Sequence, residues 1–183
     1  MNIKQDKEGV MKLNNINVDR VNGTVLEFKN NITKAKKVNK VEGEWNLNQG
    51  AQFRAVAMFE NGKVTLEADQ PTFLGGGGTQ PGPMIYCLYG SAACYVATFA
   101  TLCALEGVHL KKLRVVAESN IDFSKVFGLS DNPIAEKVKF TLHVESDAPA
   151  DKIKELEGLS RDRCPAVYCL TNPIPLETEL KIG

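Results

Sequence analysis

The chain has no charged side chain between Asp69 and Glu106, and the second part of this run, from Met84 to Leu105, reads MIYCLYGSAACYVATFATLCAL. Its apolar positions surround the whole helix circumference, without the polar stripe that a surface helix carries. A helix of this kind is buried in a protein core or in a membrane. Small and hydroxyl-bearing residues such as Gly90 and Ser91 dilute the run, and amphipathic strands are expected on both sides of it. The pattern therefore favours the core of a soluble protein over a membrane span.

Alternating apolar and polar positions predict antiparallel strands before and after this helix. Over residues 38–68 the alternation, with a tight turn at Asn61-Gly62, predicts a three-stranded meander with one buried face. After the helix, residues 113–117 and 138–144 alternate in the same way and predict two more strands. This order of elements is typical of the α+β class, with antiparallel sheets packed on a long buried central helix.

The N-terminal residues 1–37 are predicted to form an extension to a single domain at residues 38–183. The first part of the extension is polar and shows no periodicity. Asn17 or Asp19 is expected to cap a short helix that runs through Phe28.

The segment between the meander and the long helix is rich in glycine and proline, from Pro71 to Pro83. It has neither the dinucleotide fingerprint nor a P-loop, so we interpret it as a flexible connector. Later in the chain, helices are expected over residues 149–159 and from Cys164-Pro165, where proline suits the first helical position. A last strand is predicted from Leu176 to Ile182.

The charges of the 183-residue chain balance, with 22 basic and 22 acidic side chains. No long-range field therefore favours nucleic acid or an anionic membrane as a partner. Five cysteines are an odd number, and the N-terminus shows no apolar stretch resembling a signal peptide. We therefore expect a cytoplasmic protein with reduced thiols. The cysteine spacings lack the close pairs of zinc sites, so no metal or other cofactor is expected.

The three cysteines of the long helix differ in the face that they occupy. Cys87 and Cys94 are seven residues apart and share a face lined by small side chains, whereas Cys103 points to the opposite side. Cys103 is predicted to be an inert core residue. The small-residue face either admits another backbone or leaves room for a pocket. Structural burial and reactivity therefore both remain open for Cys94.

A fourth cysteine, Cys164, has surroundings that favour a thiolate. It is expected at the N-cap of a helix, with Arg161 and Arg163 before it and Pro165 after it. Free backbone N–H groups and basic neighbours stabilise negative charge on sulfur. Cys164 is therefore a candidate redox thiol, and Cys169, five residues later, is not required to face the same way.

Two stretches together resemble the OsmC/Ohr family of thiol peroxidases: GSAACYVATFATLCALEGVHLKKLRV, and further along RCPAVYCL. The glycine-rich loop at Leu74-Gly75-Gly76 also fits, and the resemblance extends over about residues 38–183. It implies an OsmC-like fold and an intertwined homodimer, with the two long helices packed centrally and the sites at the subunit interface.

The resemblance also implies a thiol-dependent peroxidase that reduces organic hydroperoxides. Cys94 would attack the hydroperoxide and become a sulfenic acid, and Cys164 would condense with it to a disulfide that a dithiol reductant opens. The cationic partner of the thiolate has two candidates, Arg54 and Lys40.

One departure from the family pattern supports an alternative function. Studied members carry an acidic residue about ten positions before the first catalytic cysteine, and Met84 occupies that position here. The alternative is a non-peroxidatic OsmC-like dimer that acts as a small-ligand binding protein or a redox sensor through the pocket beside Cys94.

Overall fold

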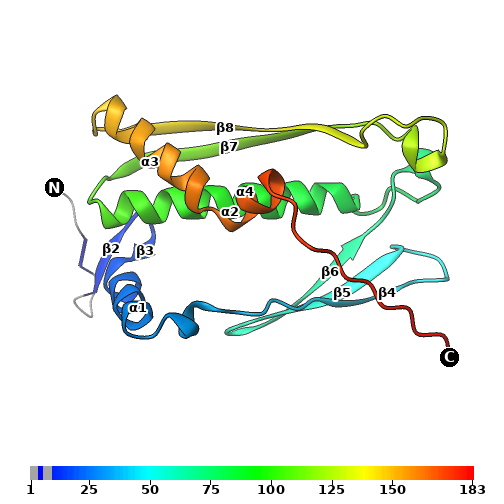
Figure 1. Ribbon diagram of the computed structural model, residues 1–183, viewed down its shortest axis with the longest axis horizontal. Helices are drawn as coiled ribbons and strands as arrows, with labels where there is room; N and C mark the ends of the chain where they lie inside the picture. Colours follow the sequence, from blue (N-terminus) through cyan, green and yellow to red (C-terminus); the bar gives the residue numbers. More distant parts are fainter. Residues whose placement is uncertain (1–3, 6–9) are drawn as a thin grey trace. The chain divides into compact units, whose positions relative to one another are not determined.

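The computed structural model describes residues 4–5 and 10–183, and Figure 1 shows the order of the elements along the chain. The chain divides into two compact units. The first contains the residues up to Arg20 together with Gly90–Gly183, and the second is Val21–Tyr89. The predicted boundary after residue 37 stays a prediction.

The first unit is built on the C-terminal part of the long helix. The elements that follow residue 83 are α2 (Pro83–Leu105), β7 (Leu110–Ile121), β8 (Ala135–Ser146), α3 (Ala150–Arg163) and α4 (Pro165–Thr171). β7 and β8 form an antiparallel hairpin in which Val115 pairs with Leu142, and the hairpin runs along α2 (Figure 1). The predicted long helix and the two strands after it are thus confirmed, and both strands extend further than their alternating core.

The core of the first unit lies between α2, α3 and the hairpin. Phe99, Cys103 and Leu156 are fully buried there, with Val108 beside them. Leu113 and other half-buried side chains of the hairpin pack against this cluster. The core therefore fixes the position of α3 on α2.

α3 continues past the predicted end near Gly158 and stops at Arg163. Ser160 is fully buried, and its hydroxyl donates to the Leu156 carbonyl at 2.6 Å. Because this last turn still packs inward, one glycine does not end the helix.

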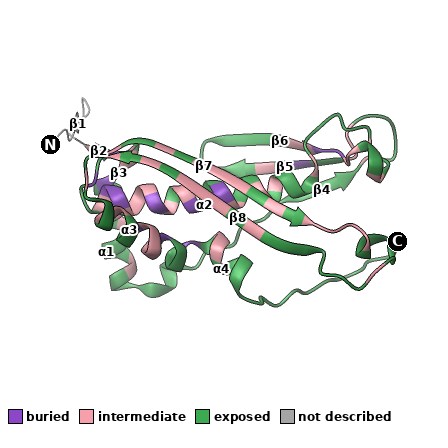
Figure 2. Cartoon of the chain, turned by 90° about the horizontal axis from the view of Figure 1, so that it is seen from above, coloured by how far each residue is buried: buried purple, intermediate pink, exposed green. Residues whose placement is uncertain are grey.

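α2 is buried along one face only within the single chain. Ala92, Tyr95 and Phe99 belong to the buried face, whereas Met84 and Tyr89 are exposed. Figure 2 shows buried and exposed bands along α2. The prediction of a helix buried on all sides is therefore not met by one chain alone. By length and composition α2 could also cross a membrane, a test that the core helices of soluble proteins pass as well.

The N-terminal extension contains a small antiparallel sheet that the sequence analysis missed. Its strands are β1 (Lys4–Gln5), β2 (Met11–Leu13) and β3 (Ile16–Asn17). Asn14 and Asn15 form the turn with φ values of 53° and 63°, a conformation that asparagine tolerates. The Asn14 amide donates to the Val108 carbonyl and accepts from the Leu110 N–H, both at 2.9 Å. These two bonds tie the turn to the start of β7.

The predicted helix that follows is α1 (Val18–Asn30). The side chain of Asn17 accepts the Arg20 N–H at 2.8 Å, as an N-cap residue does. Asp19 instead accepts the Met11 N–H at 2.8 Å. The predicted helix is confirmed, and Asn17 rather than Asp19 is its cap.

The second unit contains the predicted meander. Its strands are β4 (Glu42–Trp45), β5 (Phe53–Phe59) and β6 (Gly62–Ala68), paired antiparallel in that order. Of the side chains on these strands, only Ala55 and Ala68 are buried, while Trp45 and Phe59 are 51% and 56% exposed. The strands are confirmed, but the expected buried face is largely open in the single chain.

The glycine-rich segment after β6 is ordered rather than a flexible connector. Asp69, which is 1% exposed, accepts hydrogen bonds from the Gly77 N–H at 3.4 Å and from the N–H and hydroxyl of Thr79 at 2.9 and 2.8 Å. The Thr79 N–H is the main cause that holds the pKa of Asp69 below its usual value. A Cβ on Gly76 would lie 2.0 Å from the Gln70 carbonyl oxygen, so this close approach requires glycine.

The remaining predictions concern short or irregular segments. In the part of the chain that the structure describes, 3₁₀ turns lie at Ile32–Ala35, Thr72–Leu74 and Lys125–Phe127. The predicted last strand is wrong: residues 173–183 pair with none of the strands in residues 4–5 and 10–183, and Leu176 and Leu180 are 87% and 84% exposed. The alternation is real, but a strand also needs a neighbouring edge for its backbone hydrogen bonds.

Candidate functional site

Two cysteines that lie 70 positions apart in sequence meet in the first unit. The Cys164 thiol donates a hydrogen bond to the Cys94 sulfur, and the two Sγ atoms are 3.5 Å apart. A disulfide requires about 2.05 Å between sulfurs, so both cysteines are in the thiol form. An approach of about 1.5 Å would join them.

Cys164 lies at the joint between two helices, as its sequence surroundings predicted. It is at once the C-cap of α3 and the N-cap of α4, with φ −80° and ψ 120°. Pro165 disfavours helical geometry at the residue before it and then begins α4. This break turns the Cys164 side chain, which is 1% exposed, toward Cys94.

The surroundings of Cys94 act on its thiol in opposite directions. Burial is the main cause that raises the pKa of Cys94 above the ordinary value, and the neighbouring thiols of Cys164 and Cys169 add to the rise. The Ala166 N–H, at the start of α4, hydrogen-bonds the Cys94 sulfur and lowers the pKa. Within the described part of the chain, no basic side chain is among the groups that shift it.

The other three cysteines differ from this pair in their exposure. Cys103 is fully buried, which confirms the prediction of a core residue, and burial raises its pKa to about 11. Cys87 and Cys169 are exposed. Cys87 is seven residues from Cys94 on α2, about 10 Å along a straight helix, too far for a disulfide.

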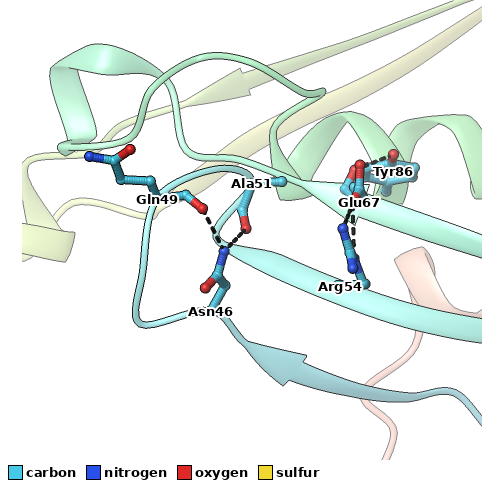
Figure 3. Close-up of polar contacts among 6 residues, drawn as sticks. All are labelled: Asn46, Gln49, Ala51, Arg54, Glu67 and Tyr86. Carbon is cyan, nitrogen blue, oxygen red and sulfur yellow. Dashed lines mark hydrogen bonds and ion pairs between the residues drawn. The ribbon is translucent and has the colours of Figure 1, made fainter.

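The two candidate cations, Arg54 and Lys40, both lie in the second unit and both pair with carboxylates there. Arg54 Nε and Nη2 donate to Glu67 Oε1 across β5 and β6, at 2.9 and 2.5 Å (Figure 3). The hydroxyl of Tyr86 donates to the Glu67 backbone carbonyl at 2.6 Å. Lys40 is exposed and pairs with Glu42 at 2.8 Å. No sequence pattern indicated Glu67 as the partner of Arg54, and the roles of both cations stay predictions.

Arg54 also borders a cavity of about 360 Å³ in the second unit, together with Trp45 and the loop between β4 and β5. The Asn46 side chain shapes this loop by donating to the carbonyls of Gln49 and Ala51 at 3.1 and 3.2 Å (Figure 3).

A polar network that the sequence analysis missed lies next to the thiol pair. Tyr95, the residue after Cys94, donates its hydroxyl hydrogen bond to Glu157 on α3. Glu157 also pairs with Arg161 one turn later, at 3.2 Å. The four-residue spacing of Glu157 and Arg161 is readable in the sequence. The bond to Tyr95 joins positions 62 residues apart and carries no local signal.

The network borders a second cavity, of about 510 Å³, between β8, α3 and α4. Its walls include Phe140 of β8 and Val167 and Leu170 of α4, beside Tyr95. Among the described residues, no group of three or more His, Cys, Asp or Glu side chains is placed to hold a metal ion.

The residues around the two cysteines match a known protein family. A sequence model described as OsmC-like protein matches residues 75–179, more than half of the chain, including Cys94 and Cys164. The chain belongs to the OsmC-like family. No curated protein sequence matches this OsmC-like chain.

Solved structures share the fold of the OsmC-like chain. An OsmC-like protein from Mycoplasma pneumoniae matches with a TM-score of 0.55 and 21% identity, over 74% of this chain and 88% of that one. A Legionella pneumophila protein, named as an organic hydroperoxide resistance protein OsmC, matches with a TM-score of 0.54 and 15% identity, over 74% and 90%. A Vibrio cholerae protein is named as a putative organic hydroperoxide resistance protein with captopril bound in one of its active sites. It matches with a TM-score of 0.53 and 17% identity, over 74% of this chain and 87% of that one. At these identities the likeness shows the fold, and it confirms the α+β class with antiparallel sheets.

Proposed function

We propose that this OsmC-like chain is a thiol-dependent peroxidase that reduces organic hydroperoxides. The Cys94 thiolate attacks one oxygen of the O–O bond, takes that oxygen to become a sulfenic acid, and releases the alcohol after a proton is added. The Cys164 sulfur then attacks the sulfenic sulfur, so that a Cys94–Cys164 disulfide forms and water leaves. A dithiol returns both cysteines to thiols and is itself oxidised to a disulfide.

The observation that carries this proposal is the 3.5 Å separation of the Cys94 and Cys164 sulfur atoms. A sulfenic acid on Cys94 would form within reach of its resolving thiol, which protects it from further oxidation. The Ala166 N–H beside the Cys94 sulfur supports the thiolate that the first step needs. Arg54 and Lys40 stay the predicted candidates for the cationic partner of the Cys94 thiolate. The cytoplasm is the proposed location of the protein.

The proposed assembly is a homodimer. Met58 and Phe59 on β5 and Met84 and Tyr89 on α2 are large apolar side chains that the single chain leaves exposed. Large exposed apolar side chains of this kind are expected to be covered in an assembly when they gather into a patch. We expect sedimentation velocity at micromolar concentration to give twice the mass of one chain. A mass of one chain at that concentration would contradict the dimer.

A second candidate function is a non-peroxidatic binding protein or redox sensor. It is favoured by the raised pKa of Cys94, which disfavours the thiolate, and by Met84 in the place of the family's acidic residue. A small molecule retained in native mass spectrometry, with Cys94 unreactive to iodoacetamide, would support this function over the first.

The peroxidase is tested by the consumption of cumene hydroperoxide with dithiothreitol as the dithiol. We expect wild-type protein to consume the hydroperoxide and Cys94→Ser to lose the protein-dependent rate, because serine cannot form a sulfenic acid. Cys87→Ser is the matched control, since Cys87 is an exposed thiol on the same helix, and it should keep the wild-type rate. Equal, slow consumption by wild type and Cys94→Ser would overturn the proposed function.

A further inference from the structure

Two contacts near the thiol pair join α2 to the end of α3. The first is the contact of the Cys94 and Cys164 sulfurs, and the second is the hydrogen bond from Tyr95 to Glu157. Cys94 and Tyr95 are consecutive on α2. Glu157 and Cys164 are seven residues apart, which places them on nearly the same face of α3, about 10 Å apart along its axis. Both contacts therefore run from the same turn of α2 to the last two turns of α3 and its C-cap.

The Tyr95 side chain is buried, and both its ring and its hydroxyl have a partner. It is 3% exposed, and its ring lies 5.5 Å from the ring of Phe140 between centroids, at 31° between planes. Burial, together with the carboxylate of Glu157, raises the pKa of Tyr95, so the phenol stays protonated and remains a donor at neutral pH. Its acceptor is fixed in turn, because Glu157 also pairs with Arg161.

The short helix that carries Cys164 has less support of its own. None of its residues from Pro165 to Thr171 is buried. On its β8 side, Val167 and Leu170 face the cavity of about 510 Å³. The position of the Cys164 sulfur is therefore determined mainly by α3, whose last two turns carry Glu157 and Arg161.

We propose that Tyr95, Glu157 and Arg161 form a positioning network that holds the Cys164 sulfur against Cys94 and so determines how fast a Cys94 sulfenic acid becomes a disulfide. The proposal rests on the proposed function and adds a residue set that acts on its second step. In that step the Cys164 sulfur forms a bond to the Cys94 sulfur, the sulfenic S–O bond breaks, and the oxygen leaves as water with the Cys164 proton. The hydrogen bond and the ion pair that form the network lead to neither sulfur atom, so we expect the first step not to depend on it.

The test separates the two steps in Tyr95→Phe, which keeps the buried ring and removes only the hydroxyl. Stopped-flow with cumene hydroperoxide gives the second-order rate of sulfenic acid formation, and mass spectrometry of quenched samples follows the disulfide. We expect the first rate to stay within about twofold and the second to fall by roughly tenfold or more, as misplacement by an ångström does. Tyr86→Phe is the control. It also removes a tyrosine hydroxyl from α2, but that hydroxyl donates to the Glu67 carbonyl and not to Glu157.

A second variant, Glu157→Ala, removes the acceptor from a half-exposed position on α3. It should slow disulfide formation to the same degree as Tyr95→Phe, and the double variant should be no slower than either one, because all three lose the same contact. Additive effects, or disulfide formation at the wild-type rate in Tyr95→Phe, would overturn the network.

The failure of the proposed function can be told apart from the failure of the network. Diamide oxidises a pair of thiols to a disulfide, is itself reduced to the hydrazine, and requires no sulfenic acid. If no variant forms a sulfenic acid with hydroperoxide, the peroxidase is wrong, but slower diamide oxidation of the Cys94–Cys164 pair in Tyr95→Phe than in Tyr86→Phe would still support the network. Equal diamide rates in these two variants would overturn it.

Discussion

One equivalent of organic hydroperoxide should convert the wild-type chain to a species that has lost two hydrogens, with Cys94 and Cys164 joined. In Cys164→Ser the reaction should instead stop at a Cys94 sulfenic acid, which dimedone traps as a stable adduct. The physical reason is the 3.5 Å sulfur separation: wild-type Cys94 has a resolving thiol in contact, and the serine variant has only a hydroxyl that cannot form the bond. Intact-mass measurement and peptide mapping distinguish the two products.

The effect of this substitution should be large, because among the described cysteines it is Cys164 whose sulfur contacts Cys94. Cys103 is fully buried in the core, and Cys87 and Cys169 are exposed. Cys169→Ser is the matched control on α4 and should still form the disulfide. If Cys164→Ser forms an internal disulfide through Cys169 at the wild-type rate, the assignment of Cys164 as the resolving cysteine is wrong.

Phe99→Ala should lower the free energy of unfolding by about 3–5 kcal/mol. Phe99 is fully buried at the centre of the core, against Cys103 and Leu156. Its loss removes buried apolar surface and leaves a cavity that the rigid helices around it fill only in part. A urea titration of both proteins, followed by far-UV circular dichroism, measures the difference.

The control for this change is Phe127→Ala, which removes the same side chain from a position 59% exposed. It should change stability by less than about 0.5 kcal/mol. If the two alanine variants unfold at the same urea concentration, the cluster around Phe99 does not hold α3 on α2. The geometry of the thiol pair would then need another cause.

The elements that the sequence predicts well are those whose signal is local. The uncharged run of α2 and the alternation in β5 and β8 lie within single segments, so periodicity alone identifies them. The surroundings of Cys164 are equally local, because Pro165 follows it directly and sets its place at the N-cap. The face of α2 that carries Cys94 follows from helix geometry in the same way.

What the sequence could not predict are contacts between separate elements. Asp69 orders the glycine-rich segment by binding Thr79, and Arg54 finds its carboxylate at Glu67, yet no spacing rule links these positions. The bond from Tyr95 to Glu157 is of the same kind. Only the tertiary fold brings such pairs together.

The missed N-terminal strands and the wrongly predicted last strand both show what hydrophobic periodicity does not report. β1 and β3 contain two residues each, too few to show alternation. The segment from Leu176 to Ile182 shows alternation without pairing in the chain, because periodicity reports an amphipathic segment and not the presence of a partner edge.

The separation of the two cysteines along the chain also bears on how the protein is made. Cys94 and Cys164 are 70 positions apart, and β7, β8 and α3 lie between them. Their contact depends on the packing of α3 onto α2 through Leu156 and Phe99. Closing a loop of that length costs conformational entropy that only the assembled core offsets. A chain still emerging from the ribosome therefore carries two separate, ordinary thiols. The contact of the two sulfurs forms only when α3 packs on α2, so the proposed disulfide belongs to the folded protein and not to the nascent chain.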